Sequence, residues 1–134
     1  MKKVVPIFAG VVTAILLVFL VEGLGHTIWP PPEGLDITNR EDLAVLMETI
    51  PTAAIAAVLV AWIVGAFAGG FVARKLDSSP DSTSSLITGG VVMIFGVLTM
   101  MTVPHPIWMW IFGVLTPIPA AMFGAKLAGE PKEA

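Results

Sequence analysis

The sequence predicts an all-α membrane protein, folded as a bundle of four transmembrane helices. Hydrophobic residues make up 56% of its 134 residues and charged residues only 13%, whereas soluble domains average about 45–50% and about 25%. The charged residues also leave four apolar stretches of roughly the twenty residues that a helix needs to cross a bilayer. Backbone groups in hydrocarbon must bond to one another, so these stretches are expected to be helices. The predicted spans are residues 4–28, 51–72, 85–103 and 106–127, within a single membrane domain, residues 1–134.

Positive charges predict how the spans are oriented, because cytoplasmic loops of membrane proteins are rich in lysine and arginine. With four spans, six basic residues fall on one side, in the two termini and in an inner loop at residues 73–84. They are Lys2, Lys3, Arg74, Lys75, Lys126 and Lys132. The outer loop, residues 29–50, holds five acidic residues and a single arginine. Both termini are therefore expected in the cytoplasm.

The outer loop is predicted to contain a short amphipathic helix lying on the outer surface. Thr38 and Glu41 have the spacing of a capping box, in which each side chain bonds the other's backbone N–H. Apolar residues then recur at helical intervals, as expected for a helix at a membrane surface. These residues are Leu43, Leu46, Met47 and Ile50.

Several short matches indicate an internal repeat of two helical hairpins with the same orientation. Two such copies would be parallel repeats, related by an axis along the membrane normal. Chance similarity between apolar segments is the alternative, and the sequence leaves both open. The matching segments are 10–12 with 90–92, 69–76 with 120–127, and the His-x-Ile-Trp tetrads 26–29 and 105–108.

The candidate polar site consists of Glu22, His26, Glu48 and His105, all expected near the outer face. Glu22 and His26 are four residues apart and share one helix face. Glu22 is the one acidic residue well inside an apolar run, and a charge there is costly unless it is paired or faces the bundle interior. The tryptophans and prolines beside the histidines are typical of helix ends at a membrane interface.

Three interpretations of these residues stay open. In the first, Glu22 and His26 bond each other and tie helix ends together. In the second, His26 and His105 bind a metal ion or haem, with Glu22 as a ligand or as the carboxylate that orients an imidazole. In the third, Glu22 handles protons or a ligand in a small oligomeric transporter. These residues do not identify a cofactor.

Small residues and prolines predict how the helices pack. Gly65 with Gly69, and Ala66 with Gly70, have the small-xxx-small spacing that lets helix backbones approach closely in lipid. This surface is expected to pack within the chain, with a homodimer as the alternative. Pro117 and Pro119 remove two backbone donors from the last span, so a kink is expected there.

The motifs together resemble a family of small bacterial four-helix inner-membrane proteins, over most of the chain. They are E-x-x-x-H at 22–26, PPP-x-G at 30–34, W-x-x-G-A-x-x-G-G at 62–70 and PHP-x-W at 104–108. The resemblance implies a bacterial inner (cytoplasmic) membrane. It supplies no catalytic residues, because that family has no established activity.

These observations favour a non-catalytic protein over an enzyme. No nucleophile–histidine–acid constellation or phosphate-binding loop stands out, and no basic patch indicates nucleic acid. The lipid bilayer is the expected environment, and a second membrane protein is the expected partner. The sequence thus predicts an accessory, assembly or scaffold component. The alternatives are a metal- or haem-binding protein and a small transporter.

Overall fold

The computed structural model describes residues 2–130 and confirms the predicted fold class. It is all-α, with four helical stretches that are long and apolar enough to cross a membrane and one short helix between the first two. The fourth stretch, Ile107–Ala128, is divided into two helices. The elements are α1 Val4–Ile28, α2 Arg40–Thr49, α3 Thr52–Leu76, α4 Thr83–Thr102, α5 Ile107–Leu115 and α6 Pro117–Ala128.

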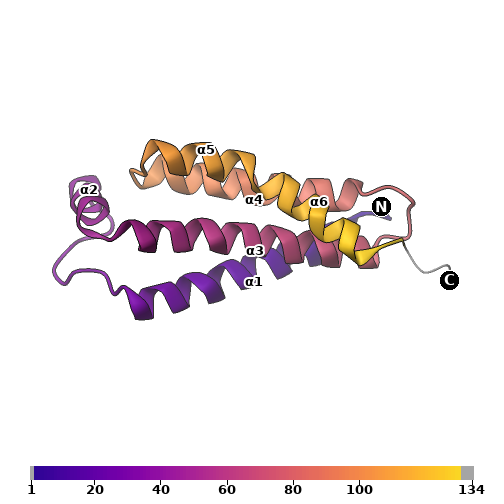
Figure 1. Ribbon diagram of the computed structural model, residues 1–134, viewed down its shortest axis with the longest axis horizontal. Coiled ribbons are helices and arrows are strands. Elements are labelled where there is room, and N and C mark those ends of the chain that lie inside the picture. Colours follow the sequence, from indigo (N-terminus) through magenta and orange to yellow (C-terminus); the bar gives the residue numbers. More distant parts are fainter. Residues whose placement is uncertain (1, 131–134) are drawn as a thin grey trace.

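Helix α3 is the central element of the bundle. Its most extensive contacts are with α1 and α6, and it also packs against α4 and α5. Helix α2 lies crosswise at one end of the bundle, which we call the α2 end (Figure 1). The start of α1, the end of α6 and the connection at residues 77–82 lie at the opposite end, which we call the loop end (Figure 1).

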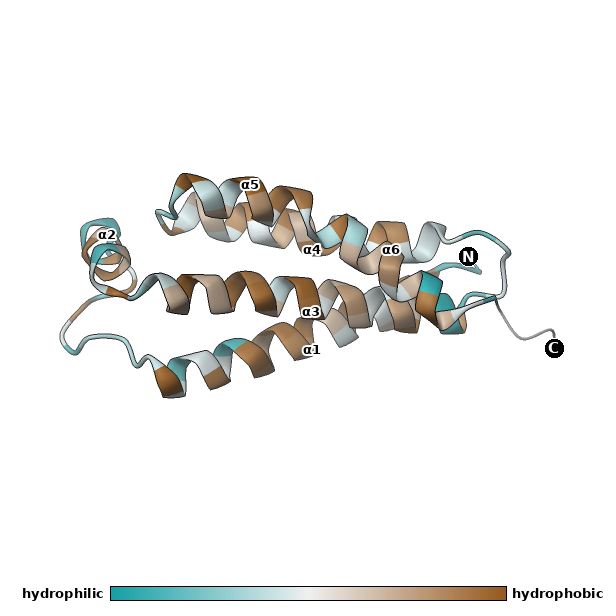
Figure 2. Ribbon diagram, viewed as in Figure 1, coloured by the Kyte–Doolittle hydropathy of each residue, from teal (hydrophilic) through white to brown (hydrophobic). Residues whose placement is uncertain are grey.

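The distribution of hydropathy matches a protein that crosses a bilayer several times. Hydrophobic residues dominate the long helices, whereas hydrophilic residues gather around α2 and at the loop end (Figure 2). Large apolar side chains on the outside of the bundle are exposed, for example Phe8 and Phe19, each 69% exposed. Such a surface is stable in lipid and not in water. The chain is a multi-pass membrane protein.

The second and third spans extend further toward the loop end than predicted. Helix α3 continues to Leu76, beyond the expected end at residue 72, and α4 begins at Thr83 rather than residue 85. The extension is possible because Arg74, which was expected in a solvated loop, is only 4% exposed and bonds the connection between the two helices.

Helix α2 forms where the short helix was predicted, but its predicted cap is wrong. Thr38 donates its hydroxyl to Asp36 Oδ1 at 2.6 Å and does not cap the helix. The N-cap is Asn39, whose side chain accepts the backbone N–H of Glu41 at 2.9 Å. Leu43 is buried, while Met47 of α2 and Ile50, the residue after α2, pack against the main core. The short helix is thereby fixed to the bundle.

The glycines of α3 are used for packing within the chain. A methyl group on Gly65 would lie 2.8 Å from the carbonyl oxygen of Ala14 in α1, and one on Gly69 would lie 2.9 Å from the Ala14 methyl group. A methyl group on Gly70 would overlap the backbone of Ala121 in α6. Because α1 and α6 already occupy this surface, it does not support the homodimer alternative.

The last span is interrupted between α5 and α6, at the position of the predicted kink. Pro117 is the first residue of α6 and is buried, whereas Pro119 is exposed. Thr116 lies between the helices, and its backbone N–H and its hydroxyl both donate to the carbonyl of Phe112, at 3.0 and 2.6 Å. The two prolines offer no N–H for the carbonyls of the preceding turn, which is why α5 ends there.

Candidate functional site

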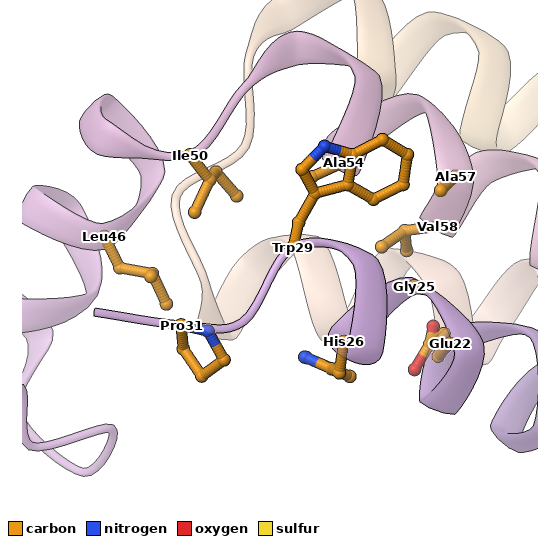
Figure 3. A pocket seen from close by; sticks show the side chains of 10 residues that line it. All are labelled: Glu22, Gly25, His26, Trp29, Pro31, Leu46, Ile50, Ala54, Ala57 and Val58. Carbon is orange, nitrogen blue, oxygen red and sulfur yellow. The ribbon is translucent and has the colours of Figure 1, made fainter. Parts of the chain in front are cut away.

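The four predicted site residues all lie toward the α2 end, but they divide into two pairs. Glu22 and His26 line one pocket, of about 90 Å³. Glu48 and His105 line another, of about 430 Å³. Figure 3 shows Glu22 and His26 along α1, with Trp29, Leu46 of α2, and Ala54 and Val58 of α3 around the same pocket.

Glu22 is held by a residue that was not among the predicted site residues. Trp62 of α3 donates its indole N–H to Glu22 Oε1 at 3.3 Å. Glu22 is six residues before the end of α1 at Ile28, about 9 Å along the helix at 1.5 Å per residue. The carboxyl group therefore lies inside the span and is half-buried. The hydrogen bond to Trp62 contributes to offsetting the cost of that position.

Trp62 is only 4% exposed and sits in the core of the bundle. Two glycines make room for its ring: a methyl group on Gly96 of α4 would lie 2.9 Å from the indole, and one on Gly113 of α5 would lie 3.0 Å from it. The sequence did contain a signal for a special role of Trp62: tryptophan favours membrane interfaces, but this one lies in the middle of a predicted span.

Glu22 also lies at a groove between α1 and α4, which we call the α1–α4 groove. The two helices approach each other near the loop end, where a methyl group on Gly10 of α1 would meet the Thr88 hydroxyl of α4 at 2.8 Å. They diverge toward the α2 end (Figure 1). The groove has a volume of about 370 Å³. Its lining is Ala14, Ile15, Val18, Phe19, Glu22, Trp62, Val92, Phe95, Gly96 and Thr99.

The second pocket, which we call the Glu48–His105 pocket, lies between α2, the start of α3 and the turn before α5. Its lining includes Met47, Glu48, Thr52, Ile55, His105 and Trp108. Nδ1 of His105 lies 2.7 Å from the carbonyl oxygen of Val103. Burial lowers the pKa of the His105 imidazole, although this bond to Val103 acts in the opposite direction. His105 therefore supports the turn between α4 and α5.

The described residues do not assemble a metal site around the two histidines. Among residues 2–130, no group of three or more His, Asp or Glu side chains is placed to hold a metal ion. His26 and His105 line different pockets. The metal or haem hypothesis remains a prediction, and it is tested by metal analysis of the untagged protein beside a His26→Ala/His105→Ala double variant.

The most extensive polar network lies at the loop end and was not predicted from the sequence. Arg74 donates to the carbonyls of Ser79 at 2.8 Å and of Asp81 at 3.0 Å. Asp77 is 2% exposed and accepts from the Ser79 backbone at 2.9 Å, the Ser79 hydroxyl at 2.6 Å and the Ser84 hydroxyl. Lys3, directly before α1, pairs with both Asp77 and Asp81.

This network is structural. Within the described residues, every buried side-chain nitrogen or oxygen has a hydrogen-bond partner. Ser85 and Thr88, both fully buried, bond the carbonyls of Gly70 and Ser84, at 2.7 and 2.8 Å. A signal existed in the run of serine, threonine and aspartate at residues 77–85, but a polar loop and a buried polar network share the same composition.

No protein-family model, no curated protein and no solved structure matches this chain. The chain is a multi-pass helical bundle with a polar network at the loop end, and with a groove and two pockets toward the α2 end.

Proposed function

We propose that this chain is a non-catalytic accessory or assembly component that binds a transmembrane helix of a partner protein in the α1–α4 groove. The observation that supports this proposal is the single carboxyl group of Glu22 in a mainly apolar groove inside the membrane. Ionisable groups within spans are rare and usually pair with another polar group. Trp62 supplies one neutral donor at 3.3 Å, which leaves acceptor capacity on the carboxyl group.

The proposed partner is an apolar helix that carries one basic side chain. The groove is lined mainly by apolar residues such as Val18, Phe19 and Phe95, and a basic group is the complement of Glu22. A volume of about 370 Å³ accommodates one or two side chains rather than a whole helix, so the partner helix would lie along α1 and α4 with its polar residue inserted.

The threonines of the bundle support a binding role over transport. Five threonine hydroxyls donate to a carbonyl of their own helix or of the helix just before, at 2.6–2.8 Å. These residues are Thr13, Thr88, Thr99, Thr102 and Thr116. A polar route through the membrane needs groups that are free to bind the solute. The Glu22–Trp62 pair therefore fits a binding site for a partner helix better than it fits a site along a solute transport route.

We further propose that the loop end faces the cytoplasm of a bacterium and that the α2 end faces outward. Lys2, Lys75 and Lys126 are exposed at the loop end, as the positive-inside tendency requires. Lys132, counted with them in the sequence, lies outside the described residues. The motif resemblance to small bacterial inner-membrane proteins supports the same membrane. Reporter domains that are active on only one side of the membrane, fused or inserted at the loop end and at the α2 end, test this orientation.

A photocrosslinking experiment tests the proposed partner. A photoreactive phenylalanine analogue replaces Phe19, which lines the groove. In the control it replaces Phe8, which is on the same helix but does not line the groove. The two side chains are equally exposed, at 69%. We expect one protein to be crosslinked through position 19 and not through position 8. Glu22→Gln should weaken this crosslink by removing the charge, while Glu41→Gln, at an exposed acid of α2 outside the groove, should leave it unchanged.

Three results would contradict the proposal: equal protein crosslinking through positions 8 and 19, crosslinking of lipid alone, or a protein crosslink insensitive to Glu22→Gln. A crosslink from position 19 to a second copy of this chain would instead support a homodimer through the groove. Mass spectrometry of the crosslinked product distinguishes these cases.

A further inference from the structure

The Glu48–His105 pocket is separate from the α1–α4 groove, and its lining combines apolar and polar side chains. It is an open pocket of about 430 Å³ whose lining includes apolar side chains, among them Met47, Ile55 and Trp108. Its polar side chains come from Glu48, Thr52 and His105. A lining that combines apolar side chains with a few polar groups is typical of small-ligand sites.

The two ionisable groups at this pocket act as hydrogen-bond acceptors. The Glu48 carboxylate can only accept. The Val103 carbonyl also only accepts, so His105 Nδ1, 2.7 Å away, must carry the proton of that bond. In a neutral imidazole the other nitrogen, Nε2, is then an acceptor. Burial lowers the pKa of His105 and favours this neutral form.

We infer that the Glu48–His105 pocket binds a primary ammonium group, supplied by an ethanolamine lipid headgroup or by a soluble amine. An ammonium offers three N–H donors and a positive charge. Glu48 complements the charge, and His105 Nε2 accepts a second donor. The lining also includes Trp108, and tryptophan is the aromatic side chain to which cations bind best.

The apolar part of the lining favours an organic ammonium over a bare metal cation. An ammonium on an organic body gains contacts with Met47 and Ile55 that a sodium or potassium ion cannot make. The inferred ligand is therefore an amine with an attached carbon chain or headgroup.

The inference is tested with the full chain in lipid nanodiscs, through the indole N–H signals of its tryptophans in NMR spectra. The Trp108 signal is assigned with a Trp108→Phe variant. In one arm, phosphatidylethanolamine is titrated into phosphatidylglycerol nanodiscs. In the other, soluble glycerophosphoethanolamine is added to phosphatidylglycerol nanodiscs. We expect the Trp108 signal to shift saturably, in the first arm for a lipid source and in the second for a soluble one.

Variants and a matched control define the site. Glu48→Gln should weaken the ammonium affinity about tenfold or more, because it removes a charge-assisted hydrogen bond. His105→Asn, which retains a donor for Val103, should weaken it by a smaller factor. Glu41→Gln changes another exposed acid of α2 that does not line the pocket, and it should leave the affinity unchanged. Unchanged signals from the other tryptophans would show that each variant is folded.

The inference fails if Trp108 responds in neither arm, or if Glu48→Gln binds as tightly as the wild type. It also fails if Glu41→Gln and Glu48→Gln weaken binding equally, since the effect would then come from overall surface charge. A response to phosphatidylcholine as large as the response to phosphatidylethanolamine would overturn the requirement for N–H donors.

Discussion

Gly70 of α3 lies directly against the backbone of Ala121 in α6, so closely that a methyl group on Gly70 would overlap the Ala121 carbonyl. The two helices therefore meet backbone to backbone. Lipid provides no hydrophobic drive for helix association, so close packing of this kind is a main source of stability in membrane bundles.

Gly70→Ala is expected to destabilise the bundle by about 1–3 kcal/mol or more, because backbone atoms of α6 cannot move aside like a flexible side chain. Gly90 of α4 is the matched control, since a methyl group there meets nothing within 4 Å. Gly90→Ala should be neutral or stabilise the helix by up to about 1 kcal/mol. Unfolding in mixed detergent micelles measures both. Equal effects would show that α3 and α6 are not in backbone contact.

Asp77 and Asp81 should make stability depend on acid pH. Burial acts to raise the pKa of Asp77, but bonds from Ser79 and Ser84 and the charge of Lys3 outweigh it and lower the pKa. The bond from Lys3, followed by those from Thr83, lowers the pKa of Asp81. A carboxyl group whose pKa is lowered by folding stabilises the folded state at pH values above its ordinary pKa of 3.8. This contribution is lost as the pH falls through the lowered pKa of the folded state.

Removing the Asp77 charge tests this dependence. Asp77→Asn should cost about 1–3 kcal/mol at neutral pH, because the buried hydroxyl of Ser84 loses its carboxylate acceptor. The loss of stability below about pH 4 should also become shallower. Glu33→Gln, an exposed acid in the segment before α2, serves as the control. An unchanged acid profile in Asp77→Asn would contradict the role given to this carboxylate.

Arg74 is expected to be required for its geometry as well as its charge. Arg74 is 4% exposed, and its guanidinium donates to the carbonyls of Ser79, Pro80 and Asp81. A lysine cannot reproduce this planar fork. Arg74→Lys should therefore destabilise the protein by about 1–3 kcal/mol in thermal or detergent unfolding. The neighbouring exposed Lys75 provides the comparison, and Lys75→Arg should have little effect. Similar values for both would remove the special role of Arg74.

His105 should titrate below its ordinary pKa of 6.5, since burial lowers that pKa. The folded state then favours the neutral imidazole, so this stabilisation is present above pH 6.5 and is lost as the pH falls through the lowered folded value. NMR of the imidazole protons measures the midpoint. His105→Asn should abolish this part of the pH dependence of stability. A midpoint at or above 6.5 would show that the ring is not buried in the turn.

The number of spans and the place of the short helix could be predicted from the sequence. Length and apolar composition decide whether a segment is a transmembrane helix, because lipid forces every span to satisfy its own backbone. The limits of α1, Val4–Ile28, agree with the predicted 4–28. The position of the break near Pro117 was also readable, because a missing N–H is a local property of the residue.

Which polar residues share a site depends on the packing of the helices. Glu22 and Glu48 were grouped because both were expected near the outer face, yet they line separate cavities. Trp62 bonds Glu22 although the two are 40 positions apart in the sequence. Lys3 bonds Asp81 although they are 78 positions apart. Periodicity and composition describe each helix alone. The rotation of each helix about its axis depends on how glycines such as Gly70 let neighbouring backbones approach.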